Sequence, residues 1–221
     1  MRRDERPQRI VWQALGVSLV FALLTRLLLL VPWLRDYRAL LFTLLGVYLP
    51  LWLLQRSGRP VDFLESDGAS LRRALTVFLI VAAIVFPLYL VAAHGWQTSV
   101  VGLQWRSFIA PSWTDVVTQL VFVALPEEFF FRGYLQSTLD RVFRVPWRIC
   151  GVRLGWAWIL TAVIFAAAHS VVHLAWWHFA ILFPGLLFGY LRARTGGLVA
   201  PILFHAACNI VAQVVGMSYG R

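Results

Sequence analysis

The segment ALTVFLIVAAIVFPLYLVAA, residues 74–93, contains no charged residue and is almost entirely apolar. A helix needs about 20 mainly apolar residues to cross the hydrocarbon core of a bilayer. This segment is therefore long enough to span a membrane as a single helix. Such a run points to an integral membrane protein rather than to a soluble domain.

The rest of the chain has the same character. Hydrophobic residues make up 60% of the 221 positions and charged residues 14%, and there are 11 Trp. We therefore expect an all-α polytopic membrane helix bundle with about seven transmembrane helices, within a range of six to eight. The candidate spans are 10–32, 38–54, 74–93, 114–138, 156–172, 176–191 and 198–216. We interpret the first as a retained helix rather than a signal peptide, because it is long and lacks a small-x-small cleavage site.

All 20 basic residues are arginines, and they give the chain a net charge of +10. If the N-terminus is cytoplasmic, 14 arginines fall in inside segments and four in outside segments, as the positive-inside rule requires. This dispersal between hydrophobic runs argues against nucleic acid as a partner. The absence of Lys favours a GC-rich genome, so we expect a multi-pass protein of a bacterial inner (plasma) membrane. No repeat or linker divides the chain, which predicts one domain over residues 1–221.

The motif LPEEFFFRGY places Glu127, Glu128 and Arg132 inside the span 114–138. A charge near the bilayer centre costs at least ~2.5–3.5 kcal/mol, so these residues need a compensating role. Glu128 and Arg132 are four residues apart and can pair on one helix face. A structural ion pair would explain these two, but it leaves Glu127 without a role. A second carboxylate suits a group that exchanges protons, and Pro126 should bend the helix beside it.

Two later spans carry further polar residues. FAAAHS places His169 near the end of one span, and HAACN places His205 and Asn209 on one face of the last. A lone histidine in a membrane helix is most often a packing residue. Three spans that each present such groups favour a converging cluster. His169, His173 and His205 could instead hold zinc, but His-Glu-x-x-His is absent, so we expect no metal or other cofactor.

These motifs together resemble those of the CPBP family, the CAAX-protease and bacteriocin-processing family of glutamic intramembrane endopeptidases. The resemblance covers residues 114–216, the expected catalytic core, and three motifs in order on three of the expected spans are far more specific than one. The motifs are Glu127-Glu128-x-x-x-Arg132, Phe165-x-x-x-His169 and His205-x-x-x-Asn209.

The resemblance implies a protease in which Glu127 activates water with help from His169, while His205 and Asn209 stabilise the oxyanion. Glu128 and Arg132 would orient the site. The expected partners are the lipid bilayer and a membrane-anchored protein or peptide, processed at a C-terminal sorting tag as in myxosortase-like proteases or as a precursor. The alternatives are a zinc-dependent variant of the protease, a non-catalytic immunity or scaffold protein of the same fold, and a transporter that uses the carboxylates as a proton relay.

Overall fold

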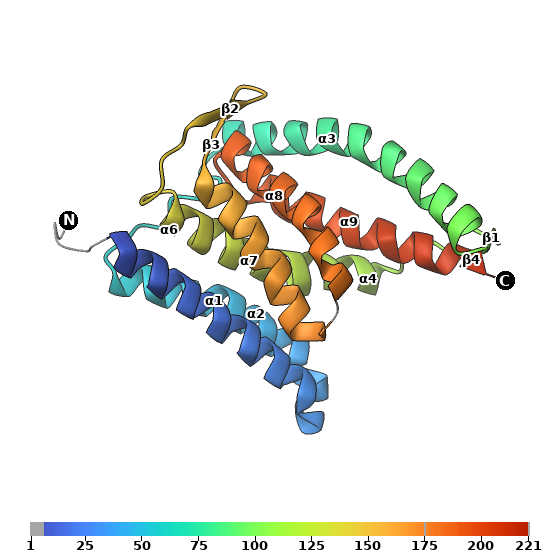
Figure 1. The fold of residues 1–221 in the computed structure, drawn as a ribbon, viewed down its shortest axis with the longest axis horizontal. Coiled ribbons are helices and arrows are strands. Elements are labelled where there is room, and N and C mark those ends of the chain that lie inside the picture. The colour runs from blue at the N-terminus through green and yellow to red at the C-terminus, as the bar shows by residue number, and fades with distance from the viewer. Residues whose placement is uncertain (1–6, 175, 221) are drawn as a thin grey trace.

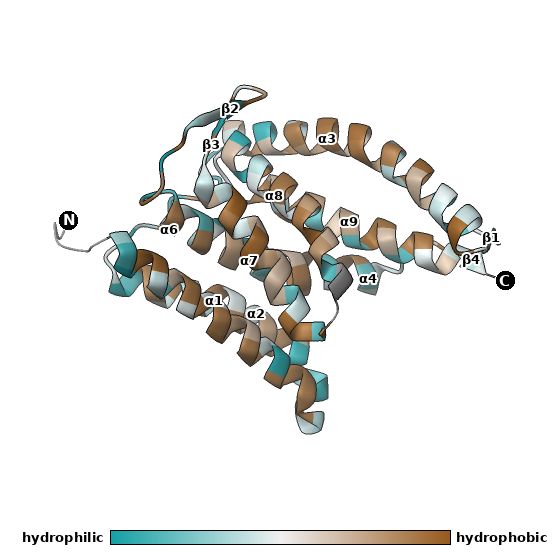
Figure 2. Ribbon diagram, viewed as in Figure 1, coloured by the Kyte–Doolittle hydropathy of each residue, from teal (hydrophilic) through white to brown (hydrophobic). Residues whose placement is uncertain are grey.

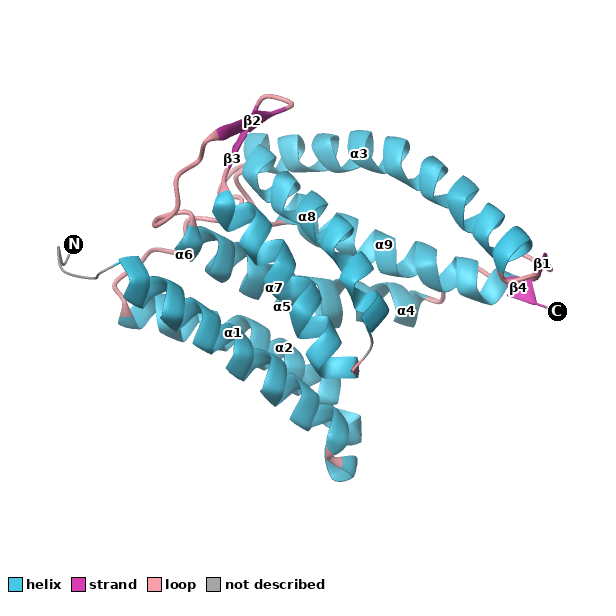
Figure 3. Cartoon of the chain, in the orientation of Figure 1, coloured by secondary structure: helices cyan, strands magenta, loops and turns pink. Residues whose placement is uncertain are grey.

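The computed structural model describes residues 7–174 and 176–220, and helices dominate it (Figures 1 and 3). Strands form two short antiparallel pairs, β1 (Gln104–Trp105) with β4 (Tyr219–Gly220) and β2 (Trp147–Ile149) with β3 (Val152–Leu154). The helical elements are α1 (Pro7–Leu30), η1 (Pro32–Tyr37), α2 (Arg38–Arg56), α3 (Gly68–Gly95), η2 (Trp96–Val100), α4 (Trp113–Val117), η3 (Thr118–Ala124), α5 (Leu125–Glu128), η4 (Phe129–Gln136), α6 (Ser137–Leu139), α7 (Trp156–His173), η5 (Trp176–Ile181), α8 (Leu182–Thr195) and α9 (Val199–Ser218).

The described residues contain a helical segment at each of the seven predicted spans. Five of these segments are long and apolar enough to cross a membrane: Pro7–Leu30, Pro32–Arg56, Gly68–Val100, Trp156–His173 and Val199–Ser218. The fourth segment runs from Trp113 to Leu139 but alternates between α-helical and π-helical stretches. The sixth begins as the 3-10 helix η5 and continues as α8. The all-α class and the multi-pass membrane character are thus confirmed.

The outer surface of the bundle is apolar. Large side chains on α1, α2 and α3 point away from the other helices, including Leu27, Trp52, Leu79 and Val91. Figure 2 shows hydrophobic residues along the length of these three helices. Helices satisfy their own backbone hydrogen bonds, so such a surface can face lipid without cost.

The core is centred on η4, all eight residues of which are buried. Phe130 stacks on Phe21 of α1 with ring centroids 4.1 Å apart. Phe131 meets Phe165 of α7 edge to face at 4.9 Å. The Phe run between the charged residues therefore packs in the interior of the bundle, as an apolar wall beside the polar groups.

The two ends of the bundle differ in charge. We call the end formed by residues 57–67, 140–155 and 196–198 the arginine-rich end. The opposite end, formed by residues 31–37, 96–112 and β4, is the arginine-poor end; Figure 1 shows the β2–β3 hairpin and β4 at these opposite ends. The residues that define the arginine-rich end include Arg59, Arg141, Arg144, Arg148 and Arg153, whereas those of the arginine-poor end include Arg35 and Arg106.

The loop at residues 57–67 closes the arginine-rich end against two helices of the core. Phe63 is buried, and its ring occupies the space beside Gly133, where a Cβ atom would approach it to 2.7 Å. The carboxylate of Glu65 accepts hydrogen bonds from the backbone N–H groups of Leu198 at 3.2 Å and Val199 at 3.0 Å. These are the unpaired donors at the start of α9, so Glu65 caps that helix.

Candidate active site

The two adjacent glutamates lie on α5, a single α-helical turn between the π-helical stretches η3 and η4. Glu127 is 9% exposed and Glu128 is fully buried. The sequence predicts a bend at Pro126; the structure places wider π turns on both sides of that residue. Such turns are rare and occur often at functional sites, because they re-aim side chains within a helix.

The predicted ion pair between Glu128 and Arg132 is present. Arg132 Nη1 lies 3.0 Å from Glu128 Oε1, and both side chains are fully shielded from solvent. Arg132 Nη2 donates to the carbonyl of Gly185 on α8 at 3.0 Å. The guanidinium also lies over the ring of Phe165, 4.3 Å from its centroid. The pair therefore joins the helix that carries the glutamates to α7 and α8.

His205 lies between the two glutamates. Its Nδ1 is 2.7 Å from Glu128 Oε1, while its Nε2 is 3.9 Å from Glu127 Oε2. The ring stacks on Phe188 of α8, with centroids 4.7 Å apart and planes 17° from parallel. Since Glu128 also accepts from Arg132, an ionised Glu128 receives the Nδ1–H of His205 and directs Nε2 towards Glu127.

His169 approaches Glu127 from the end of α7. Its Nδ1–H donates to the carbonyl of Phe165 at 2.9 Å, since a carbonyl only accepts. Its Nε2 lies 3.6 Å from Glu127 Oε2. The carbonyl of His169 in turn accepts from His178 Nδ1 at 3.1 Å, which ties η5 to the end of α7.

His169 and His205 both use Nδ1 as a hydrogen-bond donor, which determines what their Nε2 atoms can do. With Nδ1 used as a donor, each neutral ring presents the lone pair of Nε2 to the same carboxylate oxygen of Glu127. The separations of 3.6 and 3.9 Å exceed hydrogen-bond length. Polar groups at such distances are commonly bridged by water. The arrangement suits a bridging molecule that can donate hydrogens to both nitrogen and oxygen.

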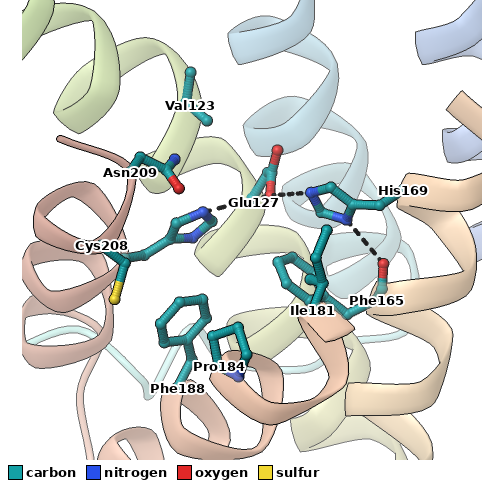
Figure 4. Close-up of a pocket in the computed structure, with 10 residues that line it drawn as sticks. Val123, Glu127, Phe165, His169, Ile181, Pro184, Phe188, Cys208 and Asn209 are labelled. Carbon is teal, nitrogen blue, oxygen red and sulfur yellow. Dashed lines mark hydrogen bonds and ion pairs between the residues drawn. The ribbon is translucent and has the colours of Figure 1, made fainter. Parts of the chain in front are cut away.

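A cavity of about 180 Å³ adjoins Glu127 (Figure 4). Glu127, His169, His205 and Asn209 line it, whereas Glu128 and Arg132 do not, so the structure separates the two glutamates. The other lining residues are mainly apolar: Val123, Phe165, Ile181, Pro184, Phe188 and Cys208. An apolar pocket with a few convergent polar groups is the usual form of a small active site.

Asn209 lies on the same helix as His205 but makes a bond that the sequence did not suggest. Its Nδ2 donates to Gln119 Oε1 on η3 at 2.9 Å. One N–H of the amide is thereby used, and one N–H and the carbonyl remain. Gln119 is thus a site residue that sequence reasoning missed. The available signal was its spacing, eight residues before Glu127 on the same membrane segment.

In the described part of the chain, no group of three or more His, Cys, Asp or Glu side chains is arranged to hold a metal ion. His173, considered above as a third ligand, has its ring centroid 5.9 Å from that of His178. It belongs to the histidines near η5 and does not line the cavity.

The fold and cavity define a multi-pass membrane protein with a cluster of buried and half-buried Glu, His and Asn side chains beside a cavity. Comparison with protein families adds a match of residues 108–211, slightly under half of the chain, to the family described as type II CAAX prenyl endopeptidase Rce1-like. All six sequence-predicted site residues lie within the matched region. No curated protein and no solved structure gives a significant match.

Proposed function

We propose that this protein is an intramembrane endopeptidase that hydrolyses a peptide bond in a membrane-associated protein or peptide. The observation that carries the proposal is the position of Glu127 Oε2 between His169 Nε2 and His205 Nε2 at the cavity. The similarity of residues 108–211 to a CAAX endopeptidase family supports the same reaction class.

The first step is attack by water. A water molecule between Glu127 and His169 donates one hydrogen to each, which directs an oxygen lone pair towards the substrate. As the oxygen bonds to the carbonyl carbon, its proton passes to Glu127 and the carbonyl electron pair moves onto the carbonyl oxygen. The carbon–nitrogen bond then breaks, and Glu127 returns the proton to the leaving amine. Glu127 thus acts first as base and then as acid.

The oxyanion needs hydrogen-bond donors during this sequence. His205 can supply Nε2–H when its ring is protonated, with its Nδ1–H held by Glu128 Oε1 at 2.7 Å. Asn209 can supply the amide hydrogen that Gln119 does not use. Glu128 and Arg132 act by positioning His205 and do not touch the substrate.

We propose that no metal takes part, since Glu127 provides the base and His205 and Asn209 the oxyanion donors. A zinc-dependent variant remains the alternative chemistry. We further propose a bacterial inner-membrane location and a C-terminal sorting tag or precursor peptide as the substrate, as in myxosortase-like proteases.

The proposal is tested with Glu127→Gln and His169→Ala in cells that produce the protein. Both variants should fold and insert normally, while an uncleaved membrane substrate accumulates; quantitative proteomics of C-terminal peptides detects it. Asp36→Asn, at an exposed position of η1, is the matched control and should cleave like the wild type. Normal cleavage by both site variants would leave a non-catalytic scaffold or immunity protein as the function.

A further inference from the structure

A row of polar side chains extends from the cavity towards one end of the bundle, along the contact between the fourth helical segment and α9. Successive members on α9 are four residues apart, so they share one helix face. We call the six residues the polar ladder: Asp115, Gln119 and Glu127 on one side, and Gln213, Asn209 and His205 on the other.

The rungs of the polar ladder pair across the two helices. Gln213 Nε2 donates to Asp115 Oδ1 at 3.2 Å, and Asn209 Nδ2 donates to Gln119 Oε1 at 2.9 Å. The third rung is the approach of His205 to Glu127 described above. Polar groups therefore continue from rung to rung between the catalytic carboxylate and the end of the helix.

The hydrogen bonds between the two helices do not use all the donors and acceptors of these amide side chains. Each of the two amide-bearing rungs is joined by one hydrogen bond, although Asn and Gln each carry two donor hydrogens and an acceptor oxygen. Asn209, Gln119 and Gln213 are only half-buried. Glu127 Oε2, Glu128 Oε2 and Arg132 Nε are buried without a hydrogen-bond partner, whereas no polar atom of Asn209, Gln119 or Gln213 is. Their remaining polar atoms are thus not sealed off by the packed protein interior.

The polar ladder leads to the arginine-poor end. Asp115 lies in the first turn of α4 and accepts from Ser112 at the helix start. Asp115 precedes Glu127 by three to four helical turns of the same segment. The cavity lies on the same side, because Ile181 at the end of η5 and Pro184 in the first turn of α8 line it.

Towards the arginine-rich end, the helical segment that follows Glu128 is surrounded by packed apolar side chains instead of polar ones. All eight residues of η4 follow Glu128 and are buried, and the aromatic side chain of Phe63 packs against them. Packed aromatic rings leave no room for water. The described residues thus place apolar packing on one side of Glu127 and half-exposed amides on the other.

We propose that the polar ladder is the route by which water reaches Glu127, and that it opens at the arginine-poor end. If water enters there, the proposed peptidase cuts its substrate on the side of the membrane opposite the arginine-rich loops. The side of cleavage rests on the proposed peptidase function, whereas the water route rests on the contacts of the polar ladder alone. The rival interpretation is that the amide pairs only hold two membrane helices together.

The test measures access to Gln119 without relying on activity. In a chain with both native cysteines replaced by serine, Gln119→Cys is exposed to a charged, membrane-impermeant thiol reagent in sealed vesicles. Ser107→Cys, in the exposed loop of the arginine-poor end, reports one face, and native Cys150 in the β2–β3 turn, in its own single-cysteine chain, reports the other. Gln119→Cys should be labelled from the Ser107→Cys face.

Val121→Cys is the matched control, two residues further along the same helical segment, outside the polar ladder and 39% exposed. It should stay unlabelled from either face, and adding Gln213→Leu to Gln119→Cys should abolish labelling because it blocks the outer rung. Failure of Gln119→Cys to be labelled, or labelling from the Cys150 face, would overturn the route. Cleavage by Glu127→Gln would overturn the peptidase but leave the labelling pattern intact, so the two failures are distinguishable.

Discussion

Replacing Glu128 with glutamine should destabilise the protein far more than a typical substitution. Glu128 Oε1 accepts from Arg132 at 3.0 Å and from His205 at 2.7 Å, in a site shielded from solvent. The neutral amide leaves the buried Arg132 guanidinium without an anionic partner, with only the Gly185 carbonyl and the amide oxygen as acceptors. Removing one partner of a buried ion pair costs about 3–5 kcal/mol. Denaturation in detergent micelles, followed by tryptophan fluorescence, measures the loss.

A double variant separates charge burial from loss of packing. Glu128→Gln combined with Arg132→Met removes the stranded cation and should recover part of the lost stability. Activity should stay low, because His205 Nδ1 then lacks the carboxylate that orients the ring towards Glu127. Asp36→Asn should remain within about 0.5 kcal/mol of the wild type. Wild-type stability of Glu128→Gln alone would refute the view that this carboxylate compensates a buried charge.

Three further predictions concern the packing, the cap and the metal. Gly46→Ala should lower stability by about 1–3 kcal/mol in the same denaturation assay, because its Cβ would come within 2.6 Å of Pro126 Cβ; Gly16→Ala, with nothing within 4 Å, should not. Glu65→Gln should lower the free energy of unfolding by about 0.5–2 kcal/mol, because it weakens the cap of α9, and it should lower kcat. Glu65→Asp should restore part of the stability and part of kcat. Dialysis against a strong chelator should leave cleavage unchanged; loss of cleavage that zinc reverses would establish the zinc-dependent alternative.

The features that could be predicted from the sequence depend on local spacing and on length. The apolar runs are long enough to indicate membrane helices on their own. The pairing of Glu128 with Arg132 follows from four-residue spacing on a helix. The approach of His169 and His205 to Glu127 was expected because isolated polar groups in lipid are costly, so they gather in the interior.

The features that could not be predicted depend on tertiary geometry. Nothing in the spacing shows that π turns flank α5, the single α-helical turn that carries both glutamates. Asn209 binds Gln119 across 90 positions of the chain, and Gln119 resembles any polar residue near a helix end. The cap that Glu65 provides to α9 spans a still longer separation, between a loop and a helix start.

The most direct test of the central claim is the source of the oxygen in the new C-terminus. Purified wild-type protein, in bilayers with the substrate found by C-terminal proteomics, is incubated in water enriched in the heavy oxygen isotope. If Glu127 activates water, mass spectrometry should find heavy oxygen in the newly formed carboxylate, and folded Glu127→Gln protein should yield no such product. Equal labelled product from Glu127→Gln, or product termini without the heavy isotope, would contradict the account.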